Sequence, residues 1–174
     1  MKTIHNNIKL YLMIPALILI LLTGTSFLSA GDSWADGFEN WNWRSPLPQG
    51  NALNDVIYDN GIFVSVGSLG TILTSINGDT WTQRVSGTTN TLGGVIYGNG
   101  IFVSVGTSGT ILTSINGDTW TQRVSGTTNN LNGVTYGNGI FVAVGSSGTI
   151  LTSTNGITWT QRVSGTTNYL FRVA

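Results

Sequence analysis

The sequence predicts an all-β fold, an array of four-stranded antiparallel sheets, or blades, arranged as in a β-propeller. Three observations lead to this prediction. The block Trp-Thr-Gln-Arg-Val-Ser-Gly-Thr-Thr-Asn starts at Trp81, Trp120 and Trp159 without any change, so its copies lie 39 residues apart. Asn-Gly pairs recur between short runs rich in β-branched and aromatic residues. Only 8% of the residues are charged and 24 of the 174 are Gly, which suits many short strands joined by tight turns.

Each copy contains four short runs that read as strands. In the first copy the runs are residues 56–58, 62–66, 71–75 and 81–85. An Asn-Gly pair follows the first and the third run of every copy, at Asn60, Asn77, Asn99, Asn116, Asn138 and Asn155. We expect type I′ turns at these pairs, because Asn and Gly tolerate the positive φ that such turns require. Consecutive strands are therefore predicted to be antiparallel neighbours, and each copy to be a meander.

The predicted strands are apolar on both faces. In the second copy Ile101, Val103 and Val105 point to one side of the sheet and Phe102 points to the other. Such a strand fits a sheet that lies between two others. A parallel β-helix would not need the hairpins, and a leucine-rich or helical repeat would need a helical segment. Sheets packed face to face around an axis therefore remain the favoured architecture.

Three complete blades are predicted, at about residues 53–85, 92–124 and 131–163. Residues 41–44 resemble the outer strand, and residues 170–174 the inner strand, of one split partial blade. Propellers typically close with four to eight blades. We therefore expect a truncated or incomplete propeller within a repeat domain at 41–174, with a ring completed across chains or an unusually small closed array as alternatives. Self-association is the expected means of covering open blade faces.

The first thirty residues differ from the repeats. Lys2, His5 and Lys9 precede an apolar run at residues 10–22, and small and polar residues follow that run. This order is typical of a secretory signal peptide at residues 1–30, cleaved after Ala30 or Ala35, with a linker at 31–40. We expect an exported protein, periplasmic or extracellular. An uncleaved membrane anchor is the alternative.

The segments that end in the repeated tryptophans also resemble a known motif. Thr-Ser-Ile-Asn-Gly-Asp-Thr-Trp at 74–81 and 113–120, and Thr-Ser-Thr-Asn-Gly-Ile-Thr-Trp at 152–159, are similar to the Asp-box hairpins of BNR-type propellers. Asn stands in place of the Asp, and the spacing is about one residue shorter. That family includes sialidases, photosystem II assembly factors and exported bacterial proteins of unassigned function, to which this chain looks most similar. The resemblance implies a structural hairpin between the third and fourth strands of each blade.

The residue types argue against catalysis and against nucleic-acid binding. The formal net charge is zero, so no basic surface is expected for a nucleic acid. Beyond residue 35 the sequence has no His, Lys or Cys, which supply common bases, nucleophiles and soft metal ligands. Four aspartates of the repeats could serve a glycosidase, but we interpret them as turn residues: Asp55, Asp59, Asp79 and Asp118. No catalytic residue, cofactor or metal is predicted, and sialidase or other glycoside hydrolase activity is disfavoured.

Two residues of the repeated block are candidates for ligand binding, once per blade. They are Trp81, Trp120 and Trp159, and Arg84, Arg123 and Arg162. The favoured interpretation is structural, with Trp packed between blades and Arg solvated on the outer strand or lying over a neighbouring ring. The alternative is a set of equivalent sugar sites, as in propeller lectins. The predicted function is a non-catalytic exported module for binding or scaffolding, whose ligand is an unknown protein or carbohydrate. The alternatives are a multivalent lectin and an assembly or chaperone factor that binds a protein partner.

Overall fold

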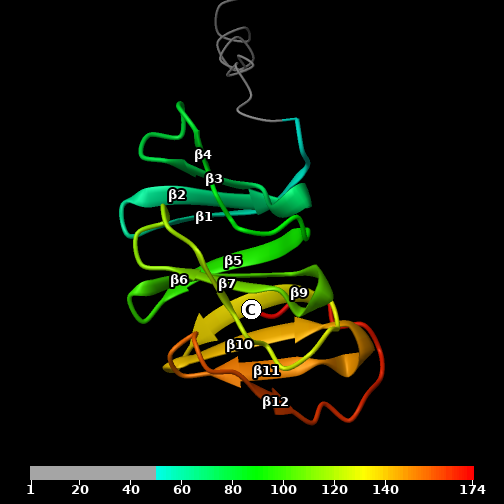
Figure 1. Ribbon diagram of the computed structural model, residues 1–174. Coiled ribbons are helices and arrows are strands. Elements are labelled where there is room, and N and C mark those ends of the chain that lie inside the picture. Colours follow the sequence, from blue (N-terminus) through cyan, green and yellow to red (C-terminus); the bar gives the residue numbers. More distant parts are fainter. Residues whose placement is uncertain (1–49) are drawn as a thin grey trace, which may run out of the picture. The chain divides into compact units, whose positions relative to one another are not determined.

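The computed structural model describes residues 50–174, which form an all-β array of three four-stranded sheets (Figure 1). The predicted signal peptide, the linker and the strand at 41–44 lie outside the described residues. Within residues 50–174 no helix is long and apolar enough to cross a membrane. The predicted fold class is confirmed for this part of the chain.

Each sheet is a meander in which strands that are consecutive in the sequence pair in antiparallel fashion. Blade 1 contains β1 (Leu53–Asp59), β2 (Ile62–Gly67), β3 (Ile72–Ser75) and β4 (Thr82–Arg84). Blade 2 contains β5 (Leu92–Gly98), β6 (Ile101–Gly106), β7 (Ile111–Ser114) and β8 (Thr121–Arg123). Blade 3 contains β9 (Leu131–Gly137), β10 (Ile140–Gly145), β11 (Ile150–Ser153) and β12 (Thr160–Arg162). A short 3₁₀ turn joins the second and third strands of every blade.

The first hairpin of each blade has the predicted turn. Asn60 and Gly61 have φ angles of 49° and 79°, so both central residues are in the left-handed region that a type I′ turn requires. Asn99 and Asn138 have φ angles of 47° and 50° and are each followed by a Gly with positive φ. These two-residue turns fix the register of β1 on β2 and of its counterparts in the other blades.

The prediction of type I′ turns is wrong for the second set of Asn-Gly pairs. Only the glycine has a positive φ there, 74° at Gly78, 76° at Gly117 and 68° at Gly156. The physical reason is loop length, because β3 ends at Ser75 and β4 begins only at Thr82. A type I′ turn joins strands through two residues, whereas this connection is longer and is stabilised by side chains.

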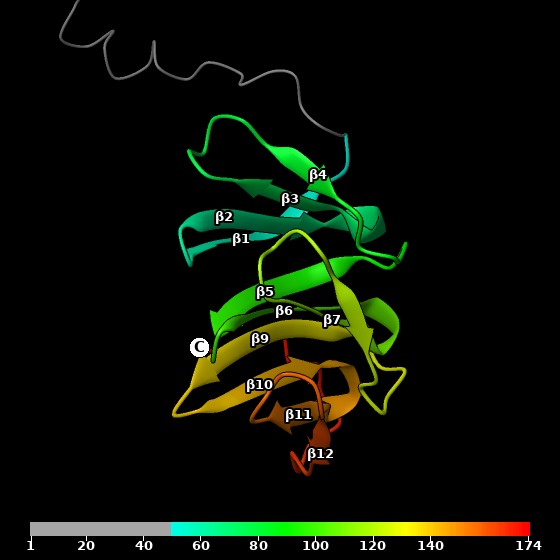
Figure 2. The same cartoon turned by 60° about the vertical axis from the view of Figure 1, so that its left-hand side comes forward.

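The three blades stack in chain order and bury the central strands on both faces (Figures 1 and 2). Phe102 and Val103 are neighbours in β6 that point to opposite faces, and both are 0% exposed. One core cluster joins blade 1 to blade 2 and includes Val64, Ile72, Leu92, Val95 and Phe102. A second cluster joins blade 2 to blade 3 and includes Val103, Ile111, Leu131, Val134 and Phe141. The sheets therefore pack face to face, as the apolar pattern predicts.

Inner strands are also tied to each other by asparagine side chains. Asn54 Nδ2 of β1 donates to the carbonyl oxygen of Leu92 in β5 at 2.8 Å. Asn132 Nδ2 of β9 donates in the same way to the carbonyl oxygen of Leu170 at 2.9 Å. Residues 170–174 therefore lie next to β9 as β5 lies next to β1. They form no strand, so the prediction of an inner strand there is wrong, because no second strand pairs with them within residues 50–174.

Candidate functional site

The hairpin between the third and fourth strands is built by side-chain hydrogen bonds. In blade 1, Ser75 Oγ accepts from the backbone N–H of Gly78 at 2.9 Å and donates to Asn77 Oδ1 at 3.1 Å. Asn77 Oδ1 also accepts from the backbone N–H of Thr80 at 3.1 Å, and Trp81 Nε1 donates to the carbonyl oxygen of Gly78 at 3.0 Å. The amide oxygen of Asn77 thus organises a turn in which a carboxylate would serve equally as acceptor.

The same bonds recur in blades 2 and 3, at 114–120 and 153–159. Because every copy has the same donors and acceptors at closely similar distances, the three hairpins present their outer residues in equivalent positions. Where the residue at one of these outer positions differs between blades, the side chain therefore changes while the backbone position stays the same.

The repeated tryptophans lie against the blade cores. Trp120 is only 9% exposed, and its ring centroid lies 6.5 Å from that of Phe102. Trp81 and Trp159 are half-buried and lie 6.1 Å and 6.4 Å from Phe63 and Phe141. The indole N–H groups bond within their own hairpins, so these contacts support packing. Sugar binding by the tryptophans stays a prediction.

The three candidate arginines are held by a threonine of the adjacent strand. Arg84 Nε donates to Thr74 Oγ1 at 2.8 Å, and the bonds of Arg123 to Thr113 and of Arg162 to Thr152 are 2.8 Å and 2.9 Å long. The hydroxyl takes the place of the neighbouring ring that the sequence suggested as a partner. Each guanidinium is thereby oriented on the outer strand of its own blade, and the three do not form one cluster.

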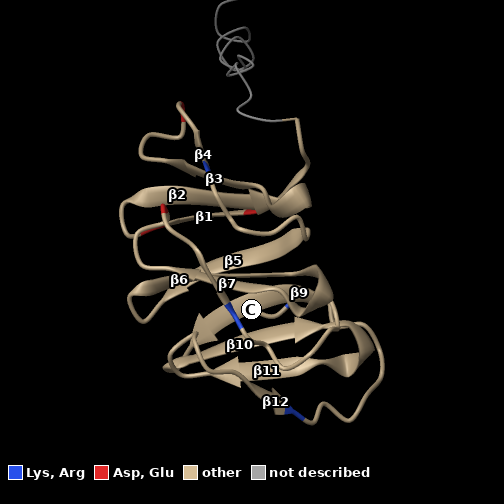
Figure 3. Ribbon diagram, viewed as in Figure 1, with Lys and Arg blue, Asp and Glu red and all other residues tan. Residues whose placement is uncertain are grey.

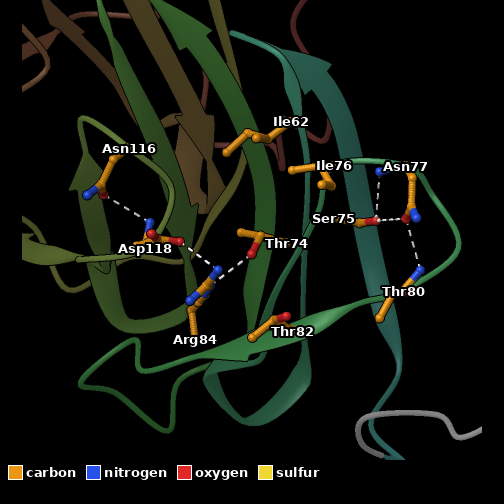
Figure 4. A pocket seen from close by; sticks show the side chains of 10 residues that line it. All are labelled: Ile62, Thr74, Ser75, Ile76, Asn77, Thr80, Thr82, Arg84, Asn116 and Asp118. Atoms are coloured by element: carbon orange, nitrogen blue, oxygen red, sulfur yellow. Dashed lines mark hydrogen bonds and ion pairs between the residues drawn. The ribbon is translucent and has the colours of Figure 1, made fainter.

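A pocket of about 480 Å³ lies where blade 1 meets the β7–β8 hairpin of blade 2 (Figure 4). We call it the junction pocket, and Ile62, Ile76, Arg84, Asn116 and Asp118 are among its lining residues. Arg84 Nη2 and Asp118 Oδ1 are 2.7 Å apart across the junction, with side chains 31% and 50% exposed. The blades carry few other charges (Figure 3), so this pair stands out on a neutral surface.

Sequence reasoning missed this ion pair. The sequence predicts that Asp118 bonds locally as a turn residue, whereas Asn116 fills that role and the Asp118 carboxylate reaches the preceding blade. The two partners lie on different blades, and no spacing rule within one repeat connects them. The second copy has Asp118 where the third has Ile157, which shows that the residue at this position varies but does not indicate which residue it contacts.

The other aspartates with described partners accept backbone hydrogen bonds. Asp55 Oδ2 accepts from the N–H of Val95 in blade 2 at 2.9 Å, and Asp59 Oδ1 accepts from the N–H of Asn60 at 2.7 Å. The interpretation of Asp55 as a turn residue is wrong, because Asp55 lies within β1 and its carboxylate ties two blades together. Asp59 supports a turn, as expected. Among residues 50–174, no group of three or more His, Cys, Asp or Glu side chains lies together as a candidate metal site.

A shallow groove recurs on every blade between the 3₁₀ turn and the segment after the fourth strand. We call these three the rim grooves, with volumes of about 950, 660 and 720 Å³ in blades 1, 2 and 3. Gln, Arg and Val of the repeated block line each groove, and the valines are strongly exposed, at 84% for Val85, 85% for Val124 and 98% for Val163. The rim grooves offer the same chemistry three times.

Comparison with known proteins relates the chain to solved structures. The sequence matches no protein-family model and no curated protein. The structure is similar to YCF48 bound to D1 peptide, with a TM-score of 0.62 and 20% identity over 72% of this chain and 44% of that one. It is also similar to YCF48 from Cyanidioschyzon merolae, with a TM-score of 0.56 and 24% identity over 70% and 42% of the two chains. The blades are those of a β-propeller.

A glycosyl hydrolase from Bacteroides ovatus also matches, with a TM-score of 0.41 and 15% identity over 77% of this chain and 56% of that one. At these identities the likeness to YCF48 shows the fold alone. The chain spans less than half the length of either YCF48 structure that it matches.

Proposed function

We propose that this protein is a non-catalytic binding module that holds a segment of a protein partner at the junction between blades. The junction pocket carries the proposal, because it places apolar side chains beside a half-exposed ion pair. Its volume, about 480 Å³, falls in the range of pockets that hold small ligands or single side chains.

The ion pair suits a polypeptide, because a peptide group is both a donor and an acceptor. The Arg84 guanidinium has five N–H donors, of which Thr74 and Asp118 engage only some, and a carboxylate such as that of Asp118 offers about four acceptor sites. Ile62 and Ile76 can contact an apolar side chain of the same segment. The propeller neighbour solved with a D1 peptide supports a peptide as the class of ligand.

Export is part of the proposal, with the signal peptide at 1–30 removed and the module acting in the periplasm or outside the cell. An assembly or chaperone role is one form that the binding of a protein partner can take.

A peptide array probed with the purified full chain tests the proposal, followed by calorimetry on the best peptide. Arg84→Met keeps the side-chain stem and removes the charge, and should weaken binding at least fivefold, since hydrogen bonds to charged groups contribute about 1.5–3 kcal/mol. Arg172→Met, which removes the same charge from an exposed residue outside the pocket, is the control and should leave affinity unchanged. Equal losses in both variants, or an array without binders, would contradict the proposal, as would hydrolysis of a glycoside by the purified chain.

A multivalent lectin is the second candidate, and the three rim grooves favour it. Binding to a glycan array with a stoichiometry near three sites per chain would support this alternative, because each groove has the same lining residues. A single site, or no bound glycan, would exclude the groove-based lectin and leave the peptide-binding proposal standing.

A further inference from the structure

The two blade junctions within the described residues share the contact between a hairpin glycine and an isoleucine of the preceding blade. Gly117 of the β7–β8 hairpin packs on Ile62 of blade 1, and Gly156 of the β11–β12 hairpin packs on Ile101 of blade 2. A Cβ added at either glycine would lie 2.6 Å from the Cδ1 of that isoleucine. The hairpin of each following blade therefore contacts the equivalent isoleucine of the blade before it. At the second junction Asn99 Nδ2 also donates to the carbonyl oxygen of Thr154 in the hairpin at 3.2 Å.

The arginine and the hairpin backbone are also placed alike. Arg84 and Arg123 each donate from Nε to a threonine of their own blade at 2.8 Å. The backbone N–H groups of Asp118 and Ile157 each donate to the asparagine Oδ1 of their hairpin at 2.9 Å. Ile157 thus stands opposite Arg123 in the position that Asp118 takes opposite Arg84.

Asp118 and Ile157 occupy equivalent positions, but one side chain is charged and the other is apolar. Asp118 supplies a carboxylate oxygen 2.7 Å from Arg84 Nη2, whereas the isoleucine side chain has no acceptor. Arg123 is half-buried, keeps its bond to Thr113, and within residues 50–174 pairs with no carboxylate. A cation is therefore fixed and partly desolvated at the second junction without the partner that its counterpart has at the first.

We infer that the second junction binds a carboxylate carried on a short aliphatic group, with one ligand oxygen taking the place of Asp118 Oδ1. The ion pair at the first junction shows how such an oxygen meets the arginine. The aliphatic part follows from the isoleucines at the corresponding positions, since Ile115 is 72% exposed, Ile157 is 45% exposed and Ile101 is half-buried. This inference rests on the proposed binding function and gives the second junction its ligand chemistry.

The expected affinity is low for an isolated ligand. Charge-assisted arginine–carboxylate bonds are short and directional, but partly exposed ion pairs contribute little net free energy. A small alkyl carboxylate should therefore bind in the millimolar range, and a partner that presents the same group on a larger surface should bind more tightly. The informative measurement is the contrast between the two junctions in one chain.

The experiment is a titration of the ¹⁵N-labelled full chain with sodium valerate, read from the Nε–H signals of Arg123 and Arg84 by nuclear magnetic resonance. The Arg123 signal should shift and saturate, whereas the Arg84 signal should not, because Asp118 already holds that guanidinium. Valeramide has the same alkyl chain without the charge and should leave both signals in place.

Two reciprocal variants complete the test. Ile157→Asp should supply the missing carboxylate and weaken valerate binding at Arg123 at least fivefold, and Asp118→Ile should make the Arg84 signal respond as well. Equal responses of both arginines in the unmodified chain, no response of Arg123, or full binding in Ile157→Asp would overturn the inference. Three peptides distinguish the two sources of a carboxylate. A peptide that ends in a free valine presents a C-terminal carboxylate, the same peptide with an amidated end presents none, and one with a glutamate before an amidated end presents only a side-chain carboxylate.

These outcomes separate the inference from the proposed function. Peptide binding that depends on Arg84, without any valerate response at Arg123, would leave the junction-pocket proposal intact and remove the second site. A valerate response at Arg123 that Ile157→Asp removes would retain the second site even if no peptide bound at the junction pocket.

Discussion

Leu53 and Leu92 occupy the same position in consecutive blades but differ in burial. Leu92 lies in the core between blades 1 and 2 and is 0% exposed, whereas Leu53 is 49% exposed. Replacing each by alanine removes the same atoms, in one case from a closed junction and in the other from a face that is half open. The pair therefore measures how much stability the junction between blades provides.

The expected losses follow from the buried atoms. Removing three buried carbons costs about 2.4 kcal/mol at about 0.8 kcal/mol each, and the cavity left behind raises the total for a closed core to about 3–5 kcal/mol. At Leu53 about half of the transfer free energy is at stake and no closed cavity forms, so we expect about 1 kcal/mol. The predicted difference between the two variants is at least about 2 kcal/mol.

Urea denaturation followed by tryptophan fluorescence measures both losses. With a slope of about 2 kcal/mol per molar urea, the midpoint should fall by about 1.5 M or more for Leu92→Ala and by about 0.5 M for Leu53→Ala. Equal midpoints in the two variants would refute the reasoning, since they would mean that packing between blades does not limit the stability of the array.

Two further predictions concern the glycine that ends β5 and the asparagine of the β7–β8 hairpin. A Cβ at Gly98 would clash with the ring of Tyr136, whereas one at the equivalent Gly137 meets nothing within 4 Å. In calorimetric melting, Gly98→Ala should therefore destabilise by about 1–3 kcal/mol and Gly137→Ala by less than about 0.5 kcal/mol. Asn116→Ala removes an acceptor that serves the hydroxyl of Ser114 and two backbone N–H groups, and should cost about 1–3 kcal/mol, while Asn116→Asp keeps the acceptor and should stay within about 0.5 kcal/mol. An alanine as stable as the aspartate would contradict the role given to the amide oxygen.

The strands and their order could be predicted because local pattern and repeat agree. Asn60 and Asn77 show where this stops, since the same Asn-Gly pair is a type I′ turn in one place and an acceptor for a longer loop in the other. The flanking residues decide, because Ser75 supplies a hydroxyl beside Asn77 that has no counterpart beside Asn60. Leu69, with a φ of 53°, could not be foreseen either, because leucine rarely adopts the left-handed region.

The sequence predicts individual residues of the candidate site but not the contact between them. The sequence identifies Arg84 and Asp118 as members of a repeat, but their contact depends on how one blade packs against the next. That arrangement comes from packing of whole faces around Val64 and Leu92, which determines depth and angle together. Local spacing contains no such information, so the sequence alone does not show what the difference between Asp118 and Ile157 changes at the junctions.

The near-identity of the blades also bears on how the chain reaches its native order. Val64, Val66 and Ile72 offer blade 2 the same surface that Val103, Val105 and Ile111 offer blade 3. During folding, the third blade can therefore dock on the first with almost the same contacts and leave the second looped out, or two chains can exchange blades at high concentration. Short connections between consecutive blades favour the correct neighbour through its high local concentration, so connection length, rather than side-chain complementarity, keeps the blades in sequence.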